Sequence, residues 1–282
     1  FDDARLLVNL VETAAEQGAA VLNYAPVTAL TRDAEGFVAG VVARDLESGR
    51  ELRAEAKVVI YAAGPFCDAV RRLAQPDPAP LIAPSQGIHL VFDGSFLPGG
   101  NAIMVPHTSD GRLMFAIPWH GHTVVGTTDT PIEDVTLEPR PLEEEIEFVL
   151  ETASRYLRKP IGRKDVLSVF VGIRPLVRSG GPTNTSALSR GHTIHIDGSG
   201  LLTLTGGKWT TYRNMAEDCV NQAATLARLP EKPCPTRHLN IHGFHPESAK
   251  FGPLSFYGAD ALLIQDLARA EPALGAALHP AL

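Results

Sequence analysis

Two glycines, a lysine and two threonines directly follow an apolar run near residue 205. The run Leu201–Leu204 predicts a buried strand, and the Gly206–Gly207 pair permits a tight turn and close approach of a ligand to the backbone. Lys208, Thr210 and Thr211 then open a predicted helix, whose N-terminus attracts electron-rich groups. The pattern predicts a site for a planar or anionic ligand. An ordinary strand–turn–helix link has the same pattern and stays as the alternative.

A histidine lies on a second predicted strand, two residues after a glycine. His89 follows Gly87 within Pro84–Phe92. Histidine titrates near neutral pH and can take the proton of a hydroxyl group as general base. On an apolar strand, a structural histidine with satisfied hydrogen bonds is the alternative interpretation.

Two arginines and an aspartate complete the set of charged candidates. Arg174 interrupts the apolar run Val169–Leu176, where an unpaired guanidinium is costly to bury, so we expect a carboxylate partner or an anionic substrate. Arg190 could bind a phosphate through two parallel N–H groups, and a surface arginine in a turn is its alternative. Asp129 follows a predicted strand, and we expect it to cap a backbone N–H in a turn rather than to act in the site.

The elements that must position these residues follow from periodicity and turn residues. Apolar spacing predicts an amphipathic helix over 3–18, and Val58–Ala62 predicts a strand buried on both faces of a parallel sheet. Many strands crossed by one helix indicate a mostly antiparallel sheet in the middle of the chain. The expected strands are 20–22, 27–30, a hairpin of 37–43 with 51–56, 87–92, 102–105, 112–117, 122–126, 166–174 and 193–197, and the expected helices are 141–157 and 259–274.

Composition narrows the function classes. The chain has 282 residues, 44% hydrophobic and 20% charged, which is typical of a globular protein rather than a disordered one. Its net charge of −7 argues against a nucleic-acid partner. Three cysteines without C-x-x-C spacing indicate neither a disulfide framework nor a zinc site, so we expect no metal and a reducing cytoplasm. No apolar run approaches the roughly 20 residues that span a bilayer.

Five segments of the sequence, taken together and in their order along the chain, resemble segments of the FAD-dependent glycerol-3-phosphate dehydrogenases. These enzymes belong with the glycine-oxidase-like and D-amino-acid-oxidase-like flavoproteins. The resemblance covers roughly residues 1–228, and its segments are Val58–Phe66, Pro84–Phe92, Gly126–Asp129, Gly172–Pro175 and Leu201–Arg213.

One departure from the family concerns the cofactor. The family begins with a strand, a G-x-G-x-x-G turn and a helix that hold the FAD pyrophosphate, and this sequence has no such segment. Gly198–Thr203 lacks the third glycine and leads into a strand instead of a helix. Since the chain also starts at Phe1, we interpret it as a fragment of a longer protein.

The resemblance implies a mixed α/β fold. We expect a partial FAD-binding, Rossmann-like layer from residues 1–80 and 200–228, around an antiparallel, β-rich substrate domain over 81–199. Residues 229–282 would form a linker and the start of a helical C-terminal domain.

The resemblance also implies roles for single residues. His89, Arg174 and Lys208 would be catalytic, and Arg190 with Arg174 would bind the substrate. FAD would lie against a set of mainly small residues: Val27, Ala63, Gly64, Gly206, Gly207, Lys208 and Thr210. Tyr61 departs from the asparagine that relatives often have there.

The implied activity is oxidation of sn-glycerol 3-phosphate to dihydroxyacetone phosphate, with electrons passed from FAD to a quinone. The enzyme would work in the cytoplasm at the inner face of the cytoplasmic membrane, and peripheral membrane contact and a homodimer are left open. A related FAD oxidase of an amine or a 2-hydroxy acid is one alternative. A fragment without activity, keeping only the substrate-domain architecture, is the other.

Overall fold

The computed structural model describes residues 2–106, 108, 111–157, 159–178 and 191–276. They fall into two compact units. The first unit contains the residues up to Pro26, the short segment Asp45–Gly49 and the residues from Lys232 onward. The second contains Val27–Arg44 and Arg50–Glu231.

The first unit is helical. Helix α1 (Asp3–Glu16) begins at Asp2, whose side chain accepts a hydrogen bond from the N–H of Arg5, and α5 spans Asp260–Ala270. His242 lies between them, with Nδ1 2.6 Å from Glu16 and Nε2 2.9 Å from Asp260. The hydrogen bond with Glu16, followed by the one with Asp260, raises the pKa of His242. Short 3-10 segments complete the unit at η6 (Pro235–Arg237), η7 (Ser248–Tyr257) and η8 (Pro272–Gly275).

Two predictions in this unit are wrong. Residues 20–22 form no strand; Val21 and Leu22 are 45% and 70% exposed, and a run this short needs a neighbouring ladder to be held extended. The expected helix 259–274 ends at Ala270 and continues as η8, because Pro272 has no N–H for a helical hydrogen bond.

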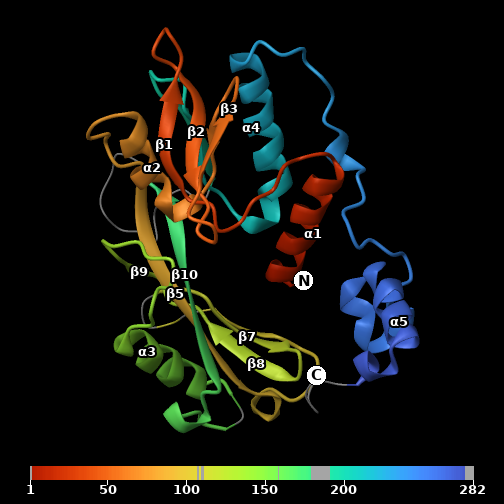
Figure 1. Cartoon of the computed structure of the whole chain (residues 1–282). Coiled ribbons are helices and arrows are strands. Elements are labelled where there is room, and N and C mark those ends of the chain that lie inside the picture. The colour runs from red at the N-terminus through yellow and green to blue at the C-terminus, as the bar shows by residue number, and fades with distance from the viewer. Residues whose placement is uncertain (1, 107, 109–110, 158, 179–190, 277–282) are drawn as a thin grey trace. The chain divides into compact units, whose positions relative to one another are not determined.

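The second unit contains a layered part built on a small sheet of order β11-β12-β4. Strands β11 (His192–Ile196) and β12 (Leu202–Gly206) are antiparallel, and β4 (Ile60–Tyr61) pairs with β12 in parallel. On one side, Leu202 packs against Cys219 and Ala223 of α4 (Tyr212–Leu226). On the other side, Leu201 packs against Val38 and against Ala74 of α2 (Cys67–Ala74). Figure 1 labels the two helices that pack on this sheet, α2 and α4.

Val38 belongs to a second sheet of order β1-β2-β3, formed by Val27–Arg32, Val38–Arg44 and Glu51–Glu55. The predicted hairpin is its β2–β3 pair, and β1 adds antiparallel to β2. The prediction that 58–62 is buried on both faces is wrong. Only Ile60 and Tyr61 form β4, and Ile60 is 41% exposed, because β4 is an edge strand paired with β12 alone in the described part of the chain.

The rest of the second unit is an antiparallel sheet of order β10-β5-β8-β7-β6, as the strand-rich pattern predicted. Its long strands β5 (Ile82–Asp93) and β10 (Ser168–Val177) pair over ten residue pairs. Ile88, Leu90 and Phe92 alternate onto one face, where they form a core with α3 (Glu143–Ser154). The remaining elements are η2 (Gly94–Phe96), β6 (Ile103–Val105), β7 (Met114–Trp119), β8 (His122–Gly126), β9 (Thr130–Pro131) and η3 (Arg163–Asp165).

The fold is thus mixed α/β, as predicted. The division into a cofactor layer and a substrate domain at the predicted boundaries stays a prediction.

Candidate active site

Two glycines make room for two of the predicted site residues, His89 and Arg174, on the sheet face opposite the core. Gly87 and His89 alternate with the core residues of β5, and His89 lies directly opposite Gly126 of β8. A Cβ atom at Gly126 would lie 2.4 Å from Cδ2 of His89. A Cβ at Gly87 would lie 2.5 Å from both terminal nitrogens of Arg174. Each glycine is therefore the surface over which one of these side chains lies.

His89 is held in a defined orientation. Its ring stacks on Phe170 of β10, with centroids 4.9 Å apart and planes at 10°. Burial, and secondly the positive charge of Arg174, lower the pKa of His89 below its usual value. A lowered pKa keeps the imidazole neutral at pH 7, which is the form that can accept a proton.

Arg174 is bound by the segment that follows β8. Its Nη1 donates to the carbonyl oxygen of Thr128 and its Nη2 to Oγ1 of Thr127, both at 3.1 Å. Nη1 also lies 3.8 Å from the carboxylate of Asp129, the expected carboxylate partner. The prediction that Asp129 caps a backbone N–H is wrong, because its side chain accepts the hydroxyl of Ser85 and faces Arg174.

Arg174 and the segment Thr127–Asp129 line a cleft of about 340 Å³. A second guanidinium, that of Arg112, lines it too and donates to the carbonyl oxygen of Asp129 at 2.6 Å. The sequence interpretation missed Arg112, since an arginine after a glycine in a turn has no pattern of its own. The lining residues are Gly111, Arg112, Leu113, Phe115, Thr127, Thr128, Asp129 and Arg174.

The end of β10 lies against two of the glycines predicted to approach a cofactor. Gly64, in η1 (Gly64–Phe66), has φ +55°, and among the described residues only Cγ of Pro175, 4.0 Å away, lies near the place of a Cβ. Gly206 has φ +74°, and a Cβ there would lie 2.6 Å from Cγ2 of Val177. Pro175 and Val177 alternate with Arg174 along β10, so the two glycines lie against the face of this strand opposite the one that carries the guanidinium.

The turn after β12 differs in detail from the sequence prediction. Gly207 has φ +80° and its N–H donates to the carbonyl oxygen of Gly191 at 3.1 Å. Lys208 is extended and exposed, and the helix does not open there. A 3-10 turn, η5 (Trp209–Thr211), comes first and α4 begins at Tyr212, because the two left-handed glycines redirect the chain before helical geometry can start.

For the other predicted site residues that the structure describes, it shows no contact with the cleft beside Arg174. Ala63 and Thr210 are exposed, and Val27 begins β1 in a different sheet with 39% of its surface exposed. Arg190 lies outside the described residues. Within the described residues, no cluster of histidine, cysteine and carboxylate side chains could hold a metal ion.

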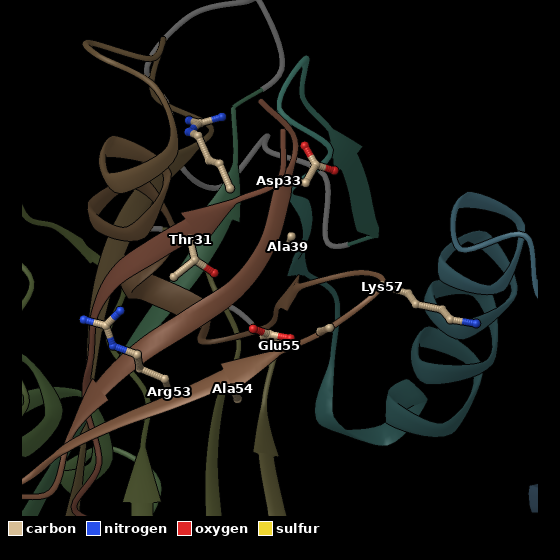
Figure 2. Close-up of a pocket in the computed structure, with 9 residues that line it drawn as sticks. Thr31, Asp33, Ala39, Arg53, Ala54, Glu55 and Lys57 are labelled. Atoms are coloured by element: carbon tan, nitrogen blue, oxygen red, sulfur yellow. The ribbon is translucent and has the colours of Figure 1, made fainter. Parts of the chain in front are cut away.

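A separate, larger cavity of about 590 Å³ lies along the β1–β3 sheet (Figure 2). Its charges do not converge. Arg53 and Lys57 extend in opposite directions away from Glu55, and Arg53 is already paired with Glu51. This mixed, divergent lining gives no reason to place an anionic substrate there.

Comparison with known proteins agrees with the resemblance seen in the sequence. Residues 1–213 match the protein family described as FAD dependent oxidoreductase. The chain is 45% identical over 253 residues to the mitochondrial glycerol-3-phosphate dehydrogenase SDP6 of Arabidopsis thaliana, a match that covers 88% of this chain and 40% of that protein. It is 42% identical over 249 residues to the human mitochondrial glycerol-3-phosphate dehydrogenase, covering 86% of this chain and 34% of that protein.

Solved structures agree as well. The glycerol-3-phosphate dehydrogenase of Bacillus halodurans, complexed with FAD, superimposes with a TM-score of 0.83 at 31% identity, covering 97% of this chain and 57% of that one. Glycine oxidase from Geobacillus kaustophilus has the same fold, with a TM-score of 0.50 at 19% identity over 80% of this chain and 56% of that one. The chain therefore spans well under two thirds of the length of these relatives.

Proposed function

Because the chain belongs to the FAD-dependent oxidoreductase family, we propose that it carries the substrate-oxidising site of an sn-glycerol-3-phosphate dehydrogenase. The observation that carries this proposal is the pairing of a neutral histidine with an arginine-lined cleft on one sheet face. His89 has a lowered pKa, and Arg174 binds the Thr127–Thr128 segment beside it. A base next to a cation is what oxidation of a secondary alcohol bearing a phosphate requires.

The residues present fit an FAD molecule next to the end of β10. Gly64 leaves its backbone open on the side where another residue would have a Cβ. Among the described residues, the buried hydroxyl of Tyr61 and the buried indole N–H of Trp209 have no hydrogen-bond partner. Buried polar atoms are normally paired, so unpaired ones support a polar ligand close to β4 and η5. When bound, FAD supplies the acceptor for the hydride that leaves C2 of the substrate.

Within this site, each side chain has one task. His89 Nε2 or Nδ1 takes the proton of the C2 hydroxyl, and stacking on Phe170 holds the ring for that transfer. Arg174 keeps its proton at any working pH, so it holds the anionic part of the substrate through charge-assisted hydrogen bonds. Arg190 adds a further guanidinium for the phosphate. Lys208 stabilises negative charge that accumulates during the reaction.

The electron acceptor, the contact with a membrane and the division into domains belong to the same proposal. The electrons leave to a quinone, and the protein meets its acceptor by peripheral contact with a membrane, at the inner face of the cytoplasmic membrane. No helix in the described part of the chain is long and apolar enough to cross a bilayer. The cofactor layer of residues 1–80 and 200–228 and the substrate domain of 81–199 are the architecture that we propose for this activity.

The test is steady-state oxidation by the whole protein loaded with FAD, using an artificial electron acceptor. Glycerol 3-phosphate should be oxidised, whereas glycerol and glycine should react far more slowly. Preference for glycine or another carboxylate substrate would instead identify a related FAD oxidase.

Absence of turnover with every substrate, together with a colourless protein that stays colourless after addition of FAD, would identify an inactive chain. Replacing the artificial acceptor by a soluble quinone tests the acceptor separately.

A further inference from the structure

Glu145 is a buried carboxylate for which the proposed mechanism has no task. It lies in the first turn of α3 and is 3% exposed. Its hydrogen-bond partners are neutral: Nε2 of Gln86 at 2.8 Å, the N–H of Leu142 at 3.1 Å, and the hydroxyls of Thr128 and Thr130 at 2.8 and 2.7 Å. Burial raises the pKa of Glu145, but these hydrogen bonds outweigh it and hold the pKa below its usual value. The four donors therefore more than compensate the cost of burying the charge, and the carboxylate in turn fixes the position of each donor.

Its contacts lead directly to Arg174. The hydroxyl of Thr128 donates to Glu145 and at the same time accepts the N–H of Ile88 at 3.0 Å. With its hydroxyl fixed in this way, Thr128 has little freedom to turn. The carbonyl oxygen of the same residue accepts Nη1 of Arg174, and neighbouring Thr127 accepts Nη2. The carboxylate, the threonine and the guanidinium therefore form one hydrogen-bonded chain from α3 to the cleft.

We propose that Glu145 is a positioning residue that fixes the Thr127–Thr128 segment and, through it, the direction in which Arg174 presents its guanidinium to the anionic group of the substrate. The inference rests on the proposed function, because it assumes that Arg174 binds that group. A purely structural role is the competing explanation, since Glu145 also caps its own helix by accepting the N–H of Leu142.

The two explanations differ in a double-mutant cycle with Arg174. In the whole, FAD-loaded protein, Glu145→Gln keeps the size of the side chain but replaces one acceptor oxygen with a donor. If Glu145 acts through Arg174, the KM for glycerol 3-phosphate should rise about tenfold while kcat changes by less than about threefold. In the Arg174→Ala background, the same substitution should change KM by less than about twofold.

Glu144→Gln, an exposed neighbour in the same helical turn, is the matched control and should leave both constants unchanged. A Glu145→Gln effect of equal size in both backgrounds would overturn the proposal, because a structural role is independent of Arg174.

A second pair of variants covers the outcome that Glu145→Gln does not fold. Thr128→Val removes the hydroxyl link but leaves Glu145 in its helix cap, and it should show the same dependence on Arg174. Thr128→Ser keeps the hydroxyl and should restore the KM of the parent. Equal effects of Thr128→Val and Thr128→Ser would contradict the proposal.

The double-mutant cycle can also be carried out without turnover. In that case, calorimetry measures the dissociation constant of inorganic phosphate for the parent, the two single variants and the double variant. If the protein fails to oxidise glycerol 3-phosphate, the proposed function fails, and the phosphate cycle still decides whether Glu145 and Arg174 are coupled. Additive phosphate affinities would overturn the positioning role.

Discussion

The cleft beside Arg174 and the turn after β12 are built on opposite principles. In and beside the cleft, the candidate side chains are held by other side chains and by the backbone: His89 stacks on Phe170, and Arg174 donates to Thr127 and Thr128 of the segment after β8. In the turn, the backbone is shaped by Gly206 and Gly207 at positive φ, while the side chain of Lys208 is exposed.

The difference indicates which part of the candidate site has a fixed geometry in the absence of a ligand. Geometry held by packed rings and buried hydrogen bonds is present before any ligand arrives. A turn of glycines offers close approach but little restraint on the groups around it. We therefore expect substitutions at or beside the cleft to have larger effects than substitutions in the turn. His89→Gln, Gly126→Ala and Lys208→Ala in the whole protein test that order, and a fourth variant tests the proposed role of Arg190.

The largest effect should come from His89→Gln. Removing a general base commonly costs about 10²–10⁴-fold in kcat. In the parent, kcat/KM should fall as the pH drops through the pKa of His89, because protonation removes the base. Since that pKa is lowered, the midpoint of the fall should lie below about pH 6.5, the ordinary value for histidine. The variant should lack this limb in a pH–rate profile, and an unchanged limb would rule His89 out as the base.

Gly126→Ala should have the next largest effect, because the added Cβ would lie 2.4 Å from the ring of His89. If overpacking places about 2 kcal/mol of strain on the reactive geometry, kcat falls about 30-fold. Gly172→Ala is the control on the same sheet, since no described residue lies within 4 Å of a Cβ there. Similar turnover by the two variants would show that the glycine at 126 does not serve the histidine.

Arg190→Ala should raise the KM for glycerol 3-phosphate at least about tenfold, because a charge-assisted contact with phosphate is commonly worth about 1.5–3 kcal/mol. Oxidation of glycerol, which has no phosphate, should barely change. Arg163→Ala, at an exposed ion pair with Glu143, serves as the control. Equal losses on both substrates would mean that Arg190 does not bind the phosphate.

Lys208→Ala should have the smallest effect of the four. The exposed lysine is screened by water, so its charge should contribute about 1 kcal/mol or less, a factor of up to about five. The loss should appear in the rate of flavin reduction by rapid mixing rather than in substrate affinity, because the negative charge develops during the reaction. Lys57→Ala is the control. A loss as large as that of His89→Gln would reverse the ranking of the two regions.

Much of the fold, and two of the candidate site residues, could be predicted from the sequence. The alternation of β5, the antiparallel sheet and the α3 region follow from periodicity, and His89 and Arg174 stand out as single polar residues in apolar runs. The family resemblance is confirmed by the match over residues 1–213. These elements can be predicted because the spacing of apolar residues along a strand or helix follows from which of its faces is buried in the core.

What the sequence did not reveal depends on contacts between distant segments. Glu145 looks like one more acidic residue in the first turn of a helix, and only the structure pairs it with Thr128 and Thr130. The contacts of Arg112 and Ser85 are likewise visible only in the structure: Arg112 donates to the carbonyl oxygen of Asp129, and the hydroxyl of Ser85 donates to the carboxylate of Asp129. The start of α4 was misjudged because the path taken after two left-handed glycines is not fixed by helix propensity.

The long β5–β10 ladder also sets the order in which the site can be assembled on the ribosome. One edge of β5 can pair with β8 as soon as residue 126 has emerged, but its other edge waits for the partner strand that starts at Ser168. At synthesis rates of about 5–20 residues per second, that wait from Val91 onward lasts roughly 4–15 s. The stacking of His89 on Phe170 and the placement of Arg174 must come after it. During this interval the nascent chain presents an unpaired strand edge, the stage at which a chaperone would protect it most effectively.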